Sequence, residues 1–414
     1  MLDRIFCKEA SGYFVLTGYS SPMTTKFIDR IGAGLLLMGL LPLGSTSTLA
    51  AEATTAENVQ PSPVGSLIRS ADDGWLDVSG FLDQAYGFLP VVVPITEPAV
   101  GLGAVGALAF IDKPQGEAGA GFGRPNISVV GALGTDNGTQ GAMALDMRYW
   151  MDDRLQSLIA GVKASVNLDY YGSNEQGYKN KSPRSYKIDL TGAGGQARYR
   201  LGDSQNWLGL GYVLATTKAT FDQEGLFADS GSNIRLGAVN FAFNHDSRDN
   251  MFTPRSGQYF EVSALLFNEA LGSDRDFTRL GMNAMQYTPL GPKWSLGVRE
   301  VATFNYGDAP FYMLPYVYMR GVPAMRYQGD QVMQLEGELR WQFWQRVSVV
   351  GFGGVGAAVK DFRDLSRTSD AAAGGVGLRY EIARKYGLHA GLDVAWGRDG
   401  PAVYIQVGSA WMRP

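Results

Sequence analysis

Residues that commonly carry out enzymatic chemistry are scarce in this sequence. The chain of 414 residues holds two histidines, His245 and His389, and one cysteine, Cys7. A hydrolase of the serine type needs a serine, a histidine and a carboxylate or amide within hydrogen-bond reach. The strand pattern described below places both histidines beside short turns at one end of the molecule, where we expect interfacial polar residues. The sequence therefore predicts no catalytic set.

Cofactor and metal sites are not indicated either. The glycine-rich runs 101–103 and 351–356 lack the Lys-Ser/Thr of a phosphate-binding loop and more often allow bends and close packing in strands. Cys7 lies upstream of the region that we interpret as the mature chain, so we expect no disulfide framework and no cysteine-based metal site. A net charge of −4 and an isoelectric point near 5.4 give no basic surface for nucleic acid.

The N-terminal part has the composition of a secretory signal. Lys26 and Arg30 form a basic region, and residues 31–43 are apolar but too short for a transmembrane helix. Small residues at 48–50 and 51–53 offer cleavage sites, which makes residues 1–50 a signal-peptide region with Met23 as its expected start. Residues 51–86 are expected to form a periplasmic linker with a short helix at 72–86, which leaves a small plug, a membrane-surface element and a docked arm as alternatives.

From residue 87 onward the sequence alternates between apolar and polar residues. In residues 158–170, Leu158, Val162 and Val166 share one parity, and polar residues such as Lys163 and Asn167 fall between them. Successive side chains of a strand point to opposite faces. We therefore predict that the apolar face of this strand meets lipid and that the polar face meets water.

The same alternation recurs in residues 334–343, 375–382 and 142–149. Leu335, Leu339 and Trp341 oppose glutamate and arginine side chains in the first of these segments. Around Gly194 the parity slips, which predicts a β-bulge.

These segments predict an all-β fold, a transmembrane antiparallel β-barrel of about sixteen strands over residues 87–414. A soluble sandwich also alternates, but its polar face is commonly rich in Lys, Glu and Thr. Here aromatic residues gather toward the strand ends, as in interfacial girdles, and short turns alternate with long connections. Short turns belong to the periplasm and long loops to the exterior of a bacterial outer membrane, which is the predicted location.

Three motifs together resemble the BamA/TamA superfamily of outer-membrane proteins, the bacterial surface antigens. Arg320-Gly321 in the longest loop is similar to the arginine-glycine signature of that family's sixth extracellular loop, with Val322 where an aromatic is usual. Glu338-Leu339-Arg340 matches the Glu-x-Arg strand that follows. The third motif resembles the family's Asp-x-Arg…Pro-x-x-Gly periplasmic turn and comprises Asp246, Arg248, Asp249, Pro254 and Gly257.

The resemblance implies a sixteen-stranded barrel whose long loop folds back into the lumen, where carboxylates of the wall hold its arginine. The family's usual aspartate on the thirteenth strand is missing, because Gly354 stands at its position. Arg320 must then find another partner. The candidates by parity are Glu336, Glu338, Glu381 and Asp393, beside the lumenal arginines Arg340 and Arg379.

The family's members that insert or secrete proteins carry POTRA domains before the barrel. The interval between the expected cleavage site and residue 87 is too short for one, so the sequence is interpreted as that of a member without them.

Prolines predict a weak seam between the first and last strands. Pro90 and Pro94 lie in the first strand, with Pro98 near its end, and proline has no backbone N–H to donate. Residues separated by an even number of positions direct their N–H groups to the same edge of a strand. The edge that lacks these N–H donors is expected to face the closing strand, 403–411. That strand is predicted to hold Val403 and Trp411 outward, and its ending departs from the usual terminal aromatic.

We therefore expect a barrel that assists insertion or translocation of a protein or lipid substrate without covalent chemistry. Its partners would be outer-membrane lipids and client outer-membrane or secreted proteins. Two alternatives remain open at this stage: a passive solute channel, and a structural surface barrel with no transport role.

Overall fold

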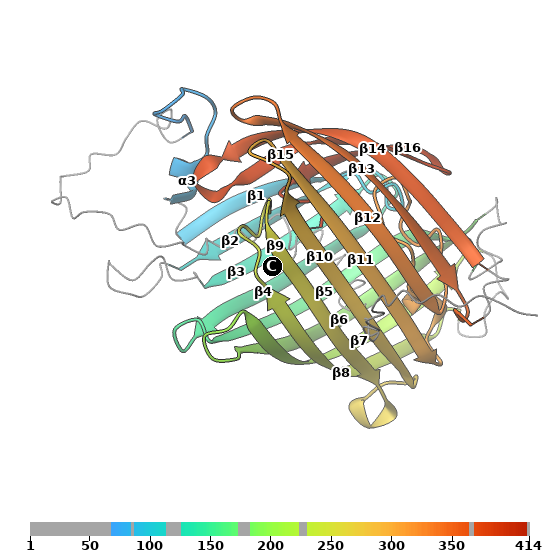
Figure 1. Ribbon diagram of the computed structural model, residues 1–414. Coiled ribbons are helices and arrows are strands. Elements are labelled where there is room, and N and C mark those ends of the chain that lie inside the picture. Colours follow the sequence, from blue (N-terminus) through green and yellow to red (C-terminus); the bar gives the residue numbers. More distant parts are fainter. Residues whose placement is uncertain are drawn as a thin grey trace, which may run out of the picture.

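The computed structural model describes residues 68–83, 87–112, 126–172, 183–222, 230–363 and 368–411. In these ranges sixteen strands form one antiparallel sheet in which each strand pairs with the next along the chain. Figure 1 shows the strands running at a slant around a wide barrel. The predicted fold class is confirmed, whereas the predicted signal region lies outside the described residues.

The elements are the following. The strands are β1 (Gly87–Ile95), β2 (Gly103–Ile111), β3 (Ile127–Thr135), β4 (Gln140–Trp150), β5 (Leu155–Tyr170), β6 (Arg184–Arg200), β7 (Asn206–Phe221), β8 (Asn233–Asp246), β9 (Gly257–Phe267), β10 (Phe277–Pro289), β11 (Trp294–Gly307), β12 (Gln331–Gln342), β13 (Val347–Val359), β14 (Thr368–Ala383), β15 (Leu388–Gly397) and β16 (Gly400–Val407). The short helices are α3 (Ser79–Asp83), η1 (Glu269–Leu271), η2 (Phe311–Met313) and η3 (Arg384–Tyr386).

The two ends of the barrel differ in their connections. Short turns join β4 to β5, β6 to β7, β10 to β11 and β12 to β13 at one end, which we call the short-turn end. The β5–β6 and β11–β12 connections are longer and lie at the other end, the long-loop end. In outer-membrane barrels these ends face the periplasm and the exterior, respectively.

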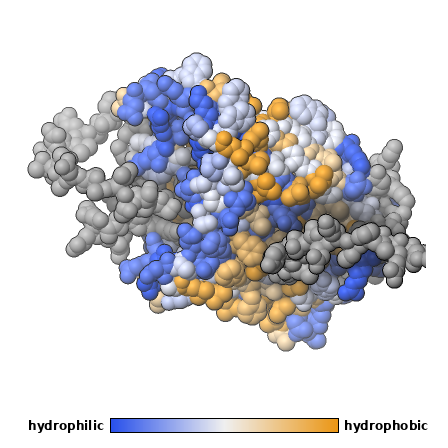
Figure 2. Space-filling model, in the orientation of Figure 1, coloured by the Kyte–Doolittle hydropathy of each residue, from blue (hydrophilic) through white to orange (hydrophobic). Residues whose placement is uncertain are grey.

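The outer wall of the barrel is apolar. Large hydrophobic side chains with high exposed fractions include Val92 at 77%, Ile159 at 65% and Leu210 at 56%. Figure 2 shows apolar residues as a band across the middle of the visible face, with hydrophilic residues gathered toward the ends. Within the described residues, no helix is long and apolar enough to cross a membrane.

The predicted outward face is correct for β12 and β14 and wrong for β4 and β5. Leu335 and Leu378 are exposed on the outer wall, whereas Val166 of β5 and Leu145 of β4 are buried in the interior. The interior beside β1–β10 is itself a packed apolar core, so both faces of these strands carry apolar residues. Where both faces of a strand carry apolar residues, alternation alone cannot show which face points outward.

One smaller prediction is also wrong. β6 keeps its register through Gly194 and Gly195 against both neighbours, so no bulge is present there. The apparent slip arises because the inward face of β6 changes along its length, from a buried Ile188 to a half-buried Arg198 near the short-turn end. In the described part of the segment 72–86, where a short helix was predicted, the helix is α3.

Leu339 provides a test of the lipid-facing side. Its side chain is 38% exposed on β12, between inward-facing Glu338 and Arg340. Replacing Leu339 with arginine is expected to lower the free energy of unfolding by about 2–4 kcal/mol if the position lies near the bilayer midplane. Gln342→Arg on the same strand, close to the short turn, is the control and should cost little. Reversible unfolding in urea with lipid vesicles measures both, and equal losses would contradict the assigned faces.

Candidate functional site: the lumenal loop and the strand seam

The β11–β12 connection, residues 308–330, folds back into the barrel; we call it the lumenal loop. Its two arms pair with each other through an antiparallel bridge between Tyr316 and Gln328 and a hydrogen bond of 2.9 Å from Val317 N to Tyr327 O. This pairing satisfies polar backbone groups that would otherwise be buried without partners. The loop therefore enters the lumen as a compact hairpin.

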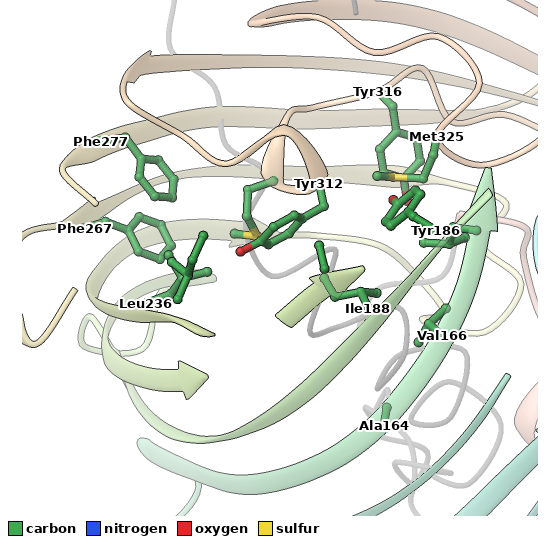
Figure 3. Close-up of a cluster of buried hydrophobic side chains, with 14 of the residues drawn as sticks. Ala164, Val166, Tyr186, Ile188, Leu236, Phe267, Phe277, Tyr312, Tyr316 and Met325 are labelled. Carbon is green, nitrogen blue, oxygen red and sulfur yellow. The ribbon is translucent and has the colours of Figure 1, made fainter. Parts of the chain in front are cut away.

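One side of the lumenal loop packs on the wall formed by β5–β10. Tyr312, Met313, Tyr316 and Met325 belong to one buried cluster with side chains from that wall. Figure 3 shows Tyr312, Tyr316 and Met325 lying close to wall residues such as Ile188. The Tyr312 hydroxyl also lies 2.6 Å from Thr217 Oγ1.

The other side of the lumenal loop packs on β12–β14. Val317, Met319, Val322 and Tyr327 form a second cluster with Val332, Ala358 and Ala371. The loop therefore spans the lumen between two parts of the wall. Burial of a large apolar side chain contributes about 1.5–3 kcal/mol, so this position is strongly stabilised.

Arg320 lies at the tip of the lumenal loop and is 8% exposed. Its Nη1 donates to Asp393 Oδ2 and its Nη2 to Glu338 Oε2, each at 2.6 Å. The guanidinium carbon lies 3.5 Å from the centre of the Phe352 ring. Charge-assisted hydrogen bonds of this length, together with a cation–π contact, are strong where water is excluded.

Gly321 allows this close approach to the wall. Its φ of +86° lies in the left-handed region, and an added Cβ would come within 3.0 Å of Ala373 Cβ and 3.2 Å of Ala395 Cβ. The Gly321 N–H donates to the Tyr404 hydroxyl of β16 at 3.0 Å. A side chain at this position would lift the loop tip off β14–β16.

Asp393 is shared by two arginines. Arg379 of β14 donates to both Asp393 oxygens, with Nη2 at 2.9 Å from Oδ2, and Asp393 is completely buried. Two arginines and two carboxylates thus form a charge-balanced cluster. A buried ion cluster persists only where each charge has such partners.

Of the four carboxylates considered for Arg320, Glu338 and Asp393 are the two that it contacts. Glu336 instead binds Arg299 at 2.8 Å and Trp411. Glu381 lies at the short-turn end, 3.9 Å from Arg384. Arg340 donates to Pro254 O at 3.4 Å.

Gly354 of β13 stands where the resemblance to the BamA/TamA superfamily leads to an aspartate, and its surroundings leave little space for a side chain. A Cβ on Gly354 would lie 2.8 Å from Glu336 Cγ and 3.1 Å from Met319 Sδ. Met319 and Glu336 therefore occupy the space that an acidic side chain at this position would need. Asp393, from a different strand, supplies the buried carboxylate.

The lumenal loop also contacts both sides of the strand seam, which the sequence did not indicate. The Ala324 N–H donates to Glu97 Oε1 at 3.1 Å, in the β1–β2 connection. Arg326 Nε lies 2.8 Å from Asp399 Oδ1, in the β15–β16 turn. We call this pair of contacts, together with Gly321–Tyr404, the loop clasp. Neither Glu97 nor Asp399 lies in a motif, so no sequence signal identified them.

The seam between β1 and β16 has no backbone ladder among the described residues. β1 pairs with β2 at nine positions, which include Pro90 and Pro94, and Pro98 lies in the following turn. Within the described chain, one hydrogen bond of 3.4 Å from Ile405 N to Thr96 Oγ1 joins the two edges. Every other pair of neighbouring strands is laddered.

The prediction that Trp411 faces outward is wrong. β16 ends at Val407, and Gly408, with φ +76°, turns the chain into the lumen. Trp411 is 4% exposed, packs with Tyr259, Met285 and Tyr287, and donates from Nε1 to Glu336 Oε2 at 3.2 Å. The indole N–H needs a buried acceptor, and Glu336 provides it.

The residues of the turn motif between β8 and β9 are hydrogen-bonded within the turn, at the short-turn end. Arg248 donates to both oxygens of Asp246, at 2.8 and 2.7 Å, and its guanidinium lies over Tyr259. Asp249 accepts from Arg255 N at 3.0 Å. Gly257 has φ +96°, and a Cβ there would lie 2.2 Å from Ser247 O.

Neither histidine is hydrogen-bonded to the ion cluster around Arg320. His245 Nδ1 is 2.8 Å from Asn206 Oδ1, and His389 Nδ1 is 3.2 Å from Gly387 O. Over the described ranges, no group of His, Cys, Asp and Glu side chains is arranged to hold a metal ion.

Comparisons with known proteins agree with this geometry. Residues 122–315 match the Omp85 superfamily domain, a range that ends shortly before Arg320. Comparison with curated proteins gave no match.

Solved structures of similar fold include BamA from Haemophilus ducreyi lacking POTRA domains 1–3, with a TM-score of 0.53 and 14% identity over 82% of this chain and 79% of that one. CdiB from Escherichia coli gives 0.54 and 14% over 77% of this chain and 61% of that one. CdiB from Acinetobacter baumannii gives 0.51 and 9% over 77% and 59%, respectively. This chain thus spans about three fifths of each CdiB chain, and identities this low show a shared fold.

Proposed function

We propose that this chain, an outer-membrane β-barrel whose residues 122–315 match the Omp85 superfamily domain, assists the insertion or translocation of a protein or lipid substrate without covalent chemistry. Its partners would be outer-membrane lipids and client outer-membrane or secreted proteins. The observation that carries this proposal is the unladdered edge of β1 in an otherwise fully paired sheet.

An unpaired strand edge in a membrane has a strong tendency to acquire a partner. Each unsatisfied backbone group in hydrocarbon costs several kcal/mol, and an extended segment that adds to the edge satisfies a whole row of groups. A client strand that docks along residues 87–95 would gain these hydrogen bonds while it enters the bilayer. The loop clasp would keep the two sides of the seam close together while no client is bound.

The lumenal loop argues against the passive channel. It packs on both parts of the wall at one level of the lumen, which leaves little room for solute flow there. A structural barrel without transport would be expected to close its seam with a backbone ladder, because the ladder stabilises the fold and removes a reactive edge.

Reconstitution tests the proposal. The purified protein in liposomes should accelerate assembly of an urea-unfolded outer-membrane client into a protease-resistant, heat-modifiable form. Liposomes with an unrelated closed barrel are the control. Assembly no faster than with that control would exclude client insertion, and single-channel recordings on the same preparation would then distinguish a channel from a structural barrel.

A further inference from the structure

The segment before β1 is bound to the far side of the seam; we call residues 68–83 the N-terminal strap. Arg346, in the β12–β13 turn, inserts between two strap carboxylates. Its Nε lies 2.7 Å from Asp73 Oδ2, its Nη1 lies 2.9 Å from Asp77 Oδ2, and its side chain is completely buried. An arginine buried this deeply is stable because both carboxylates compensate its charge.

Aromatic and backbone contacts extend this attachment to β14. The Trp75 ring stacks on Tyr380 with centroids 6.2 Å apart and lies 6.0 Å from Trp344. Val78 N donates to Ile382 O at 2.8 Å, and the Tyr380 hydroxyl donates to Leu76 O at 2.8 Å. The strap is therefore tied to β14 by its backbone as well as by side chains.

From β14 the strap crosses the ends of β15 and β16 before it reaches β1. The Ser79 hydroxyl accepts from Lys385 N at 3.2 Å, in the β14–β15 connection. Val78 and Leu82 pack in a cluster with Leu388 of β15 and Val407 of β16. β1 begins at Gly87, four residues after α3 ends. Figure 1 shows α3 beside the ends of these strands and close to the start of β1.

We propose that the N-terminal strap closes the seam at the short-turn end, and that its release from Arg346 allows the seam to open. This inference rests on the proposed function, since it assigns a control to the same seam. The loop clasp joins β1–β2 to β15–β16 at the long-loop end, and the strap joins β1 to β12–β16 at the opposite end. The loop clasp and the strap thus hold the two ends of the β1–β16 seam, which has no backbone ladder among the described residues.

The strap should resist mild acid and detach in strong acid. The hydrogen bond from Arg346 lowers the pKa of Asp73 from 3.8 to about 2. Burial disfavours the charged form of Asp77, but hydrogen bonds from Ser79 and Arg346 outweigh it and lower that pKa as well. Arg384, 3.6 Å from Asp73, and Glu381 complete the charged groups around Arg346. Because both folded-state pKa values are depressed, this stabilisation is full above about pH 4 and is lost as pH falls toward 2.

Spin labels measure this directly. A label on Ala71→Cys, in the exposed part of the strap, should stay immobile between pH 7 and pH 4 and become mobile as pH approaches 2. The far-UV spectrum controls for unfolding of the barrel. A label that becomes mobile already near pH 5 would contradict the assigned ion pairs.

The decisive experiment measures the seam itself, without a client. Labels on Phe88→Cys of β1 and Gln406→Cys of β16, in a Cys7→Ser background, give the distance distribution across the seam by pulsed electron paramagnetic resonance. Arg346→Ala should broaden this distribution toward longer distances. Arg384→Ala, which removes an exposed arginine near the same carboxylate, should leave it unchanged. Labels on Val130→Cys and Ala144→Cys, partners in the β3–β4 ladder, should not respond in either variant.

The label on Ala71→Cys verifies that the strap is released, and Trp75→Ala is added where Arg346→Ala alone leaves it bound. If Arg346→Ala fails to fold, Trp75→Ala with Asp77→Asn replaces it. A released strap with an unchanged seam distribution overturns the inference. A broadened seam with no client assembly in liposomes would instead retain the strap and reject the proposed function.

Discussion

Replacing Arg320 with alanine is expected to lower the free energy of unfolding by about 3–5 kcal/mol, because it removes one of the two cations that balance the charges of Asp393 and Glu338 in a largely buried ion cluster. Asp393 is completely buried and keeps Arg379, whereas Glu338 loses the ion pair at 2.6 Å. The lumenal loop should detach at its tip, since Arg320 joins it to β12 and β15. Urea unfolding in lipid vesicles gives the energy, and the temperature of gel-mobility change gives the loss of heat resistance.

Arg398→Ala is the matched control for this prediction. Arg398 binds Asp370 at 2.8 Å, a distance similar to that of the Arg320 pairs, but the two side chains are 47% and 55% exposed. An exposed pair contributes about 0–1 kcal/mol. Equal losses in both variants would show that the buried cluster does not stabilise the barrel as described.

Shortening the lumenal loop should have the second large effect, on ion flow. If residues 311–327 are replaced by a short glycine-serine linker, the apolar clusters that fill the lumen lose their loop side chains. A barrel of sixteen strands without a plug is wide enough for an aqueous channel, so conductance in planar bilayers should rise by more than about tenfold.

Removing residues 269–271 is the control, because η1 lies in the β9–β10 loop and has no buried residues. The conductance of this deletion variant should equal that of the unmodified protein. If the shortened lumenal loop also leaves conductance unchanged, another part of the chain blocks the lumen. If the unmodified protein conducts as strongly as the shortened variant, the passive-channel alternative is favoured.

The barrel was predictable from sequence because its signals repeat in every strand. Alternation, aromatic residues near strand ends and ordered motifs act together over residues 87–414. The orientation of individual strands was less predictable, since it depends on what fills the lumen. Val166 faces inward into an apolar cluster that also holds side chains of the lumenal loop, and these are more than a hundred residues away in the chain.

The contacts of Arg320 show a second limit. Parity placed Glu336 and Glu338 on the same lumenal face, but residues two apart lie about 7 Å apart along the strand. That difference determines that Glu338 reaches Arg320 while Glu336 reaches Arg299 and Trp411. Depth within the barrel depends on strand tilt and loop packing, which periodicity does not encode.

Segments outside the regular strands were the least predictable. Trp411 continues the alternation of β16 by parity, but the left-handed conformation of Gly408 ends the strand and turns the chain inward. For the N-terminal strap the sequence predicted a short helix but not the place where it binds. Its role depends on Arg346, which lies far away in sequence and in no motif.

A reversible lock across the seam tests the central claim most directly. Thr96→Cys, directly after β1, and Ile405→Cys of β16 are the pair chosen to be oxidised to a disulfide in a Cys7→Ser background, because a hydrogen bond joins these two residues across the seam. Val130→Cys and Ala144→Cys form the matched lock within a regular ladder. We predict that oxidation of the seam pair reduces client assembly in liposomes to the level of the control barrel, that reduction restores it, and that the ladder pair has no effect. Full assembly with the seam locked would contradict the account.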